Sequence, residues 1–101
     1  MRIEAHPAGQ LPEAAIALRR QVFTAEQQVP EELEWDDTDA SAVHYLVHDD
    51  TGEPIATARL YEAQTGWGAI GRMAVAASAR GQDVGTRLLT RMLQDGLATW
   101  S

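Results

Sequence analysis

An amphipathic helix predicted from about Val84 to Trp100 constrains the fold more than any other part of the sequence. Its apolar residues repeat at helical spacing in two adjacent rows. The rows are Val84, Leu88 and Met92, and Leu89, Leu93 and Leu97. A helix with so wide an apolar face has to lie on another element, and we expect that element to be a sheet.

The residues before this helix predict that sheet. An apolar stripe at helical spacing first predicts another helix from Pro12 to about Glu26. Alternating apolar and polar residues then predict a hairpin of Val43–His48 and Ile55–Tyr61, and a third extended stretch covers Trp67–Val75. The stretch between the first helix and the hairpin is acidic and irregular. With a strand at the N-terminus, these elements predict one domain, residues 1–101, of class α+β with a mainly antiparallel sheet.

Composition excludes several classes of function. The chain has 8 Lys and Arg residues against 15 Asp and Glu residues, so its net charge of −7 disfavours nucleic acid and suits an amine substrate. It has no cysteine, which excludes disulfides, thiolate metal sites and a cysteine nucleophile. No apolar run approaches a membrane span and no targeting signal is readable, so we expect a cytoplasmic protein with no membrane partner.

The loop before the last helix has the features of an anion site. Arg80 stands directly before Gly81, and Gly85 follows at the start of the helix. The first N–H groups of a helix lack partners and lie at the positive end of its dipole, so such a junction favours phosphate. The alternative is that the glycines only allow the chain to turn. Because the loop directly follows a strand that ends at Val75, we favour the phosphate site.

This strand, loop and helix resemble the acetyl-CoA signature of the GNAT N-acetyltransferase superfamily, Gln/Arg-x-x-Gly-x-Gly/Ala after the fourth strand. Arg80, Gly85 and the opening Arg80-Gly81-Gln82 match it. Upstream segments resemble the ElaA-like branch of that superfamily. They are Arg20–Phe23, Glu26–Pro30, Leu33–Glu34, Asp36, Asp39 and Ala42–His44. The resemblance covers nearly the whole chain and implies a three-layer fold, with a mixed, mainly antiparallel sheet flanked by helices.

The resemblance also implies how acetyl-CoA would be held as cosubstrate, without a metal. Backbone groups of Met73 and Val75 would bind the pantetheine arm, and Arg80 would add positive charge at the entrance of the loop. The pyrophosphate would rest on a run of amides. These are the amides of Gly81, Gln82, Asp83, Val84, Gly85 and Thr86. The acetyl group would then pass directly from the thioester to an amine of a small molecule or a protein.

The base that removes the amine's proton is harder to choose. In the inferred fold, the acidic loop after the first helix lines the acceptor end of the cleft, where carboxylates could hold an ammonium group. We choose Glu26 as the candidate base and His44 as the alternate. The other acidic residues nearby form a solvated face in the simpler interpretation. They include Glu32, Glu34 and Asp36.

The sequence departs from the family pattern in two ways. Asp83 stands where the pattern has its first glycine, so we expect coenzyme binding that is weakened but not abolished. The chain ends at Ser101, before a further strand and helix that the resemblance implies, which would leave Trp67–Val75 as a sheet edge open to pairing. We therefore expect either a shortened enzyme completed as a homodimer or a truncated product. A non-catalytic CoA-binding or protein-interaction module and an inactive fragment remain alternatives.

Two other motifs carry no function in this interpretation. Gly66–Gly71 matches the dinucleotide pattern G-x-G-x-x-G, but the pattern needs a helix immediately after it and here a strand continues. We expect these glycines to serve a turn and a strand bulge. His44 and His48 would lie about 13 Å apart along a strand, too far to share one metal ion. We expect His44 to be packed and hydrogen-bonded, and His48 to lie at the surface.

Overall fold

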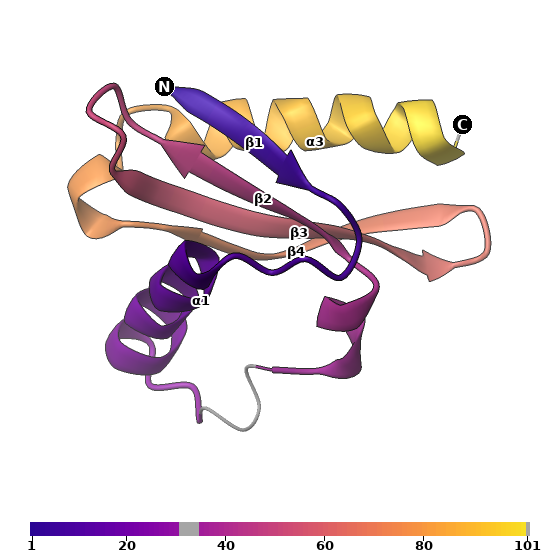
Figure 1. Ribbon diagram of the computed structural model, residues 1–101, viewed down its shortest axis with the longest axis horizontal. Helices are drawn as coiled ribbons and strands as arrows, with labels where there is room; N and C mark the ends of the chain where they lie inside the picture. Colours follow the sequence, from indigo (N-terminus) through magenta and orange to yellow (C-terminus); the bar gives the residue numbers. More distant parts are fainter. Residues whose placement is uncertain (31–34, 101) are drawn as a thin grey trace.

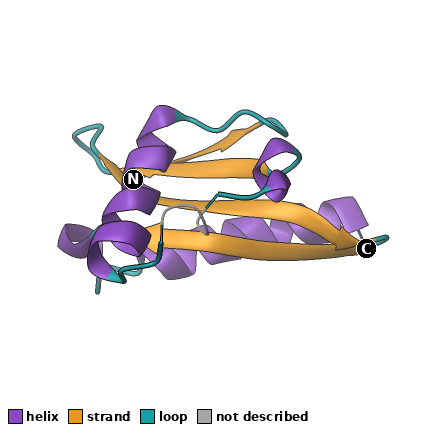
Figure 2. Ribbon diagram, turned by 90° about the horizontal axis from the view of Figure 1, so that it is seen from below, coloured by secondary structure: helices purple, strands orange, loops and turns teal. Residues whose placement is uncertain are grey.

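The computed structural model describes residues 1–30 and 35–100. Four strands form one antiparallel sheet in the order β1-β2-β3-β4, and the two α-helices pack on opposite faces of it (Figure 1). The strands are β1 (Arg2–His6), β2 (Val43–His48), β3 (Pro54–Gln64) and β4 (Trp67–Val75). The view from below shows the same three layers, helix, sheet and helix (Figure 2). The predicted class, α+β with an antiparallel sheet flanked by helices, is confirmed.

The first helix differs from its prediction in one respect. Residues Glu13–Arg19 form the α-helix α1, and Arg20–Glu26 continue it as the π-helix η1. The apolar stripe is buried as expected, because Ala15, Leu18 and Val22 are each no more than 5% exposed. π-helices are rare in proteins and are frequent at functional sites. This one ends at Glu26, the candidate base chosen from the sequence.

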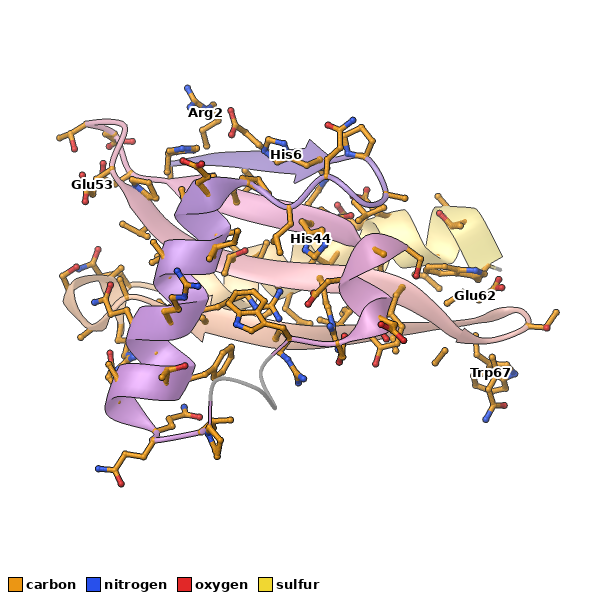
Figure 3. All side chains as sticks on the ribbon, turned by 60° about the horizontal axis from the view of Figure 1, so that its bottom comes forward. Arg2, His6, His44, Glu53, Glu62 and Trp67 are labelled. Carbon is orange, nitrogen blue, oxygen red and sulfur yellow. The ribbon has the colours of Figure 1, made fainter. Side chains whose placement is uncertain are left out.

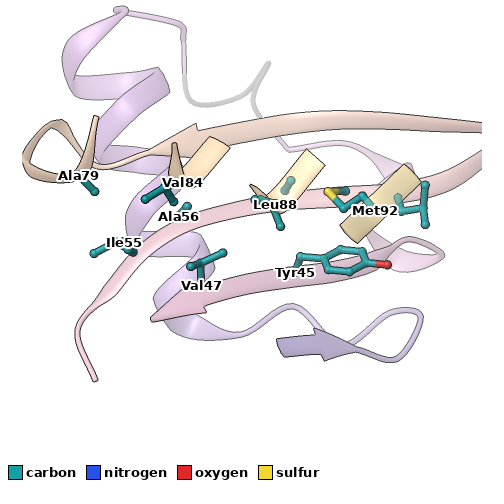
Figure 4. Close-up of a cluster of buried hydrophobic side chains, with 10 residues drawn as sticks. Tyr45, Val47, Ile55, Ala56, Ala79, Val84, Leu88 and Met92 are labelled. Atoms are coloured by element: carbon teal, nitrogen blue, oxygen red, sulfur yellow. The ribbon is translucent and has the colours of Figure 1, made fainter. Parts of the chain in front are cut away.

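The helix α3 (Val84–Trp100) has the predicted bounds and covers one face of the sheet. Its row of Val84, Leu88 and Met92 is buried on β2 and β3, as Figure 4 shows. The second row is not buried, which corrects the expected wide contact: Leu89, Leu93 and Leu97 are 39%, 51% and 65% exposed. The reason is that β4 is an edge strand in the described part of the chain, so this side of α3 extends past the sheet.

The exposed side of α3 and the start of β4 enclose an apolar groove of about 420 Å³. Trp100 lies on Gly68 in the lining of this groove, so close that an added Cβ there would clash with the indole ring. Gly66 has a φ of 79° and turns the hairpin between β3 and β4. Trp67 points away from the sheet at this end (Figure 3). The G-x-G-x-x-G run is therefore a hairpin turn and a strand, as the sequence analysis expected.

On the opposite face, the acidic segment after η1 is fixed by buried arginines. Residues Asp37–Ala40 form the short helix η2. Arg19, which is 1% exposed, donates to Asp39 at 2.8 Å, and Arg59 donates to Asp36 at 2.7 Å and to Asp39 at 3.0 Å. Asp36 is exposed, as the solvated face predicted, with a 39% exposed side chain, but its carboxylate is also paired with Arg59. The predicted residues Glu32 and Glu34 lie outside the described residues.

Across the described ranges, no helix combines the length and the apolar character needed to cross a membrane.

Candidate functional site

The candidate site begins where β4 changes its pairing with β3. Thr57 pairs with Ala74 and Arg59 pairs with Gly71, so β4 carries one extra residue in this interval. Arg72 takes up that bulge with a φ of 49°, a left-handed conformation that is uncommon outside glycine. Bulges bend a strand and are common beside functional sites. A bulge at the glycines was expected from the sequence, but the left-handed conformation of Arg72 was not; the neighbouring Gly71 was the only sequence signal for it.

After β4 the chain forms the short helix η3 (Ala77–Ala79) and turns into α3. The amides of Ala79 and Arg80 close this turn on the carbonyls of Ala76 and Ala77. The first main-chain bond at the start of α3 runs from the amide of Arg87 to the carbonyl of Asp83, at 3.0 Å. The amides of residues 84–86 precede that donor, and the geometry of a helix gives them no partner within it. They can therefore donate to a ligand.

A concavity of about 270 Å³ lies at this junction. The residues that line it are Val75, Ala79, Arg80, Gly81, Asp83, Val84, Gly85 and Thr86. Of the nine residues predicted to hold the coenzyme, only Met73 and Gln82 are not in this lining. Met73 lies next to it, since its Sδ would be 4.0 Å from a Cβ placed on Gly85. Gln82 is turned to the protein instead, and its Nε2 donates to the carbonyl of Ser78 at 3.2 Å.

Asp83 is the residue that departs from the family pattern, and its backbone explains why glycine is common there. Its φ is 61°, in the left-handed region that glycine adopts without strain. Aspartate is one of the few other residues that tolerate this region. The side chain is exposed and lies directly before the first residue of α3. The substitution thus keeps the turn and adds a negative charge to the rim of the concavity.

Arg80 connects the loop to the end of the first helix. Its Nε donates to the carbonyl oxygen of Val75 at 3.0 Å, and its Nη2 donates to Oε2 of Glu26 at 2.8 Å. Glu26 and Arg80 are 54 residues apart in the chain. The structure therefore brings the candidate base Glu26 to the candidate coenzyme loop. The sequence offered no signal for this contact.

His44 is held away from that contact. It is 1% exposed, and its Nε2 lies 2.9 Å from the carbonyl oxygen of Asp39. Figure 3 shows it on the sheet face between α1 and η2. Burial lowers the pKa of His44, and the hydrogen bond and charge of Asp39 oppose that effect only in part. The packed, hydrogen-bonded environment expected for His44 is confirmed, and its role as an alternate base stays a prediction.

The carboxylates of Asp36 and Asp39 are also occupied. The hydrogen bond from Arg59 lowers the pKa of Asp36, to which Arg72 also donates at 3.2 Å. Burial alone would raise the pKa of Asp39, but the hydrogen bonds and charges of Arg19 and Arg59 outweigh it and lower the pKa. Both groups are ionised and internally paired at neutral pH. They hold η2 on the sheet and offer no unpaired charge to an ammonium group.

Within residues 1–30 and 35–100, no three His, Asp or Glu side chains are grouped as metal ligands would be. His48 is not the surface residue that we expected, because its side chain is only 13% exposed.

Comparison with known proteins places this geometry in a family. Residues 13–99 match the model of the acetyltransferase (GNAT) family. Among solved structures, the chain is similar to Escherichia coli ElaA, with 26% identity and a TM-score of 0.84 over 98% of this chain and 71% of that one. It is also similar to an acyl-CoA N-acyltransferase from Pseudomonas aeruginosa, with 29% identity and a TM-score of 0.81 over 99% of this chain and 71% of that one.

Proposed function

Because the chain belongs to the GNAT family of acetyltransferases, we propose that it binds acetyl-CoA and transfers the acetyl group to a primary amine. The observation that carries this proposal is the concavity between the end of β4 and the start of α3. It is lined by the residues that the coenzyme signature selects in the sequence. It also joins unpaired helix amides to a guanidinium, and this combination suits a diphosphate.

We propose that each part of the junction holds one part of the coenzyme. The amides from Gly81 to Thr86 and the guanidinium of Arg80 would bind the diphosphate. The open edge of β4 at Met73 and Val75 would accept the pantetheine arm through backbone groups. The bulge at Arg72 supports this assignment, because it bends the strand directly before these two residues.

The transfer needs no covalent intermediate on the enzyme. The amine nitrogen attacks the thioester carbonyl carbon, the C–S bond breaks, and CoA leaves with the electron pair of that bond. The nitrogen gives up a proton to a base, and the coenzyme thiolate takes up a proton. The base stays a prediction from the sequence: Glu26 pairs with Arg80 at the diphosphate end of the proposed site, and the pantetheine arm separates that end from the thioester where the amine reacts.

A thermal unfolding titration with acetyl-CoA tests the proposal. A ligand that binds only the native state stabilises it by about 2.7 kcal/mol at a concentration of 100 times its Kd. We expect the midpoint to rise with acetyl-CoA, and CoA release to follow when an amine is added. A rise without turnover across a panel of amines would indicate a CoA-binding module. An unchanged midpoint at saturating acetyl-CoA would exclude the coenzyme site and leave the interaction module or the inactive fragment.

We also propose a homodimer, as predicted from the sequence. It is supported by β4, which is an edge strand of the described sheet, and by the exposed apolar side chains of Trp67, Leu93 and Leu97 beside it. Light scattering after size exclusion tests this, and a monomer at every concentration would contradict it.

A further inference from the structure

We propose that Glu26 is a positioning residue that holds the guanidinium of Arg80 at the coenzyme site, and that the coenzyme binds by taking this guanidinium from it. This inference rests on the proposed function and adds a regulated contact to the same site. The carboxylate of Glu26 and the diphosphate of the coenzyme compete for one guanidinium. Binding of acetyl-CoA and release of Glu26 are then one event.

The contact joins two elements that approach the site from different parts of the fold. Glu26 is the last residue of η1, and Arg80 directly follows η3. The loop between β4 and α3 lies at the same end of the sheet as α1 (Figure 1). The Nη2–Oε2 distance of 2.8 Å is that of a charge-assisted hydrogen bond. An ion pair thus joins the end of the first helix to the coenzyme loop.

The pair is weak enough to be exchanged. The side chains of Arg80 and Glu26 are 46% and 34% exposed, so water and salt screen their attraction. A diphosphate carries more negative charge than one carboxylate and can accept two parallel hydrogen bonds from a guanidinium. The amides at the start of α3 bind the same diphosphate, so they add to its advantage over Glu26. The exchange should therefore favour the coenzyme.

Arg80 also occupies a second group that the coenzyme needs. Its Nε donates to the carbonyl of Val75, one of the two residues proposed to bind the pantetheine arm. When the guanidinium turns to the diphosphate, this carbonyl becomes available to an amide N–H of pantetheine. Glu26 loses its partner in the same movement. One side chain thereby couples the opening of the strand edge to the release of Glu26.

A double-mutant cycle on acetyl-CoA affinity tests the competition. The wild-type chain, Glu26→Gln, Arg80→Gln and the double variant are titrated with acetyl-CoA by calorimetry. We expect Glu26→Gln to lower the Kd about threefold in the wild-type background, which is the strength of an exposed ion pair. In the Arg80→Gln background the same substitution should leave the Kd unchanged, because no guanidinium remains for Glu26 to hold.

Asp83→Asn is the matched control, because Asp83 also lies at the rim but has no bond to Arg80. It removes one negative charge and should lower the Kd by the same factor in both backgrounds. If Glu26→Gln behaves like this control, its effect is only charge repulsion and the proposal is wrong. An unchanged Kd for Glu26→Gln in the wild-type background would also overturn it. If the folded wild-type chain does not bind acetyl-CoA, the proposed function fails, and this inference fails with it.

Discussion

Two segments of this chain carry charged residues and differ in what holds those residues. In Asp36–Ala40, the carboxylates of Asp36 and Asp39 are bound by Arg19 and Arg59, whose side chains are 1% and 5% exposed. In the loop after β4, Arg80 is paired only with exposed or main-chain groups that a ligand can replace. The carboxylates of the first segment therefore need no ligand to balance their charge. A charged residue of this chain therefore marks a candidate binding site only where a ligand can replace its partners within the protein.

The sharpest test of this difference is to remove a carboxylate from the first segment. Asp39→Asn leaves the buried Arg19 and Arg59 with less compensation, and breaking such a pair destabilises a fold by about 3 kcal/mol. We expect a loss of that size in the free energy of unfolding, measured in urea. Glu26→Gln, which breaks the exposed pair, is the matched control and should lower stability by less than about 1 kcal/mol. Equal losses for both variants would erase the contrast between the segments.

Acid should affect the same segment. The pKa values of Asp36 and Asp39 are lowered in the folded protein, so their contribution to stability is complete above the unfolded value of about 4. It is lost as the pH falls through the lower folded values, because protonation then breaks the ion pairs. The difference in unfolding free energy between wild type and Asp39→Asn should therefore shrink as the pH falls below about 4. A constant difference down to pH 2 would contradict this account.

At the start of α3, a side chain larger than a methyl group should weaken coenzyme binding. Gly85→Ala places a Cβ 3.7 Å from Cγ2 of Val75, an ordinary contact, and alanine favours a helix over glycine by up to about 1 kcal/mol. Because the coenzyme signature accepts alanine here, Gly85→Ala should keep both stability and binding, whereas we expect Gly85→Leu, whose larger side chain fills the concavity, to bind acetyl-CoA about tenfold more weakly, equivalent to about 1.4 kcal/mol. Gly96→Ala, on the same helix with its nearest contact at 3.8 Å, should leave the Kd unchanged.

The smallest effect is expected at Asp83. Asp83→Gly removes a charge from the rim and relieves a left-handed residue, so we expect acetyl-CoA to bind about threefold more tightly. Stability should change little, because the relief of backbone strain is offset by the greater freedom of glycine in the unfolded chain. Asp83→Asn keeps an αL-tolerant residue and separates charge from strain. A Kd that stays the same in both variants would remove Asp83 from the account of affinity.

Most of the fold was predictable because it depends on periodic local patterns. The helix α3 begins and ends at the predicted residues, and the predicted hairpin forms from β2 and β3. That most of the residues selected after β4 line one concavity was also predictable, since they are nearly contiguous. The π-helix η1 was not predicted, because the apolar stripe was matched to the spacing of an α-helix throughout.

The contacts that the sequence did not predict all join distant residues. The pairing of Glu26 with Arg80 spans 54 residues, and that of Asp36 with Arg59 spans 23. No local pattern carries such information, because each charged residue has several possible partners until the sheet brings one of them near. The exposure of Leu89, Leu93 and Leu97 was missed for a related reason. The sequence of a helix does not indicate how wide the sheet beneath it is.

The packing of Trp100 on Gly68 helps to fix the orientation of the whole helix α3. The indole Nε1 also donates to Glu62 at 2.8 Å, and the hydroxyl of Tyr45 donates to Asp95 in the C-terminal third of α3 at 2.6 Å. These contacts fix the C-terminal part of the helix, and the buried side chains of Val84 and Leu88 fix its N-terminal half on the sheet. The amides of the first turn therefore meet an incoming anion in a fixed direction.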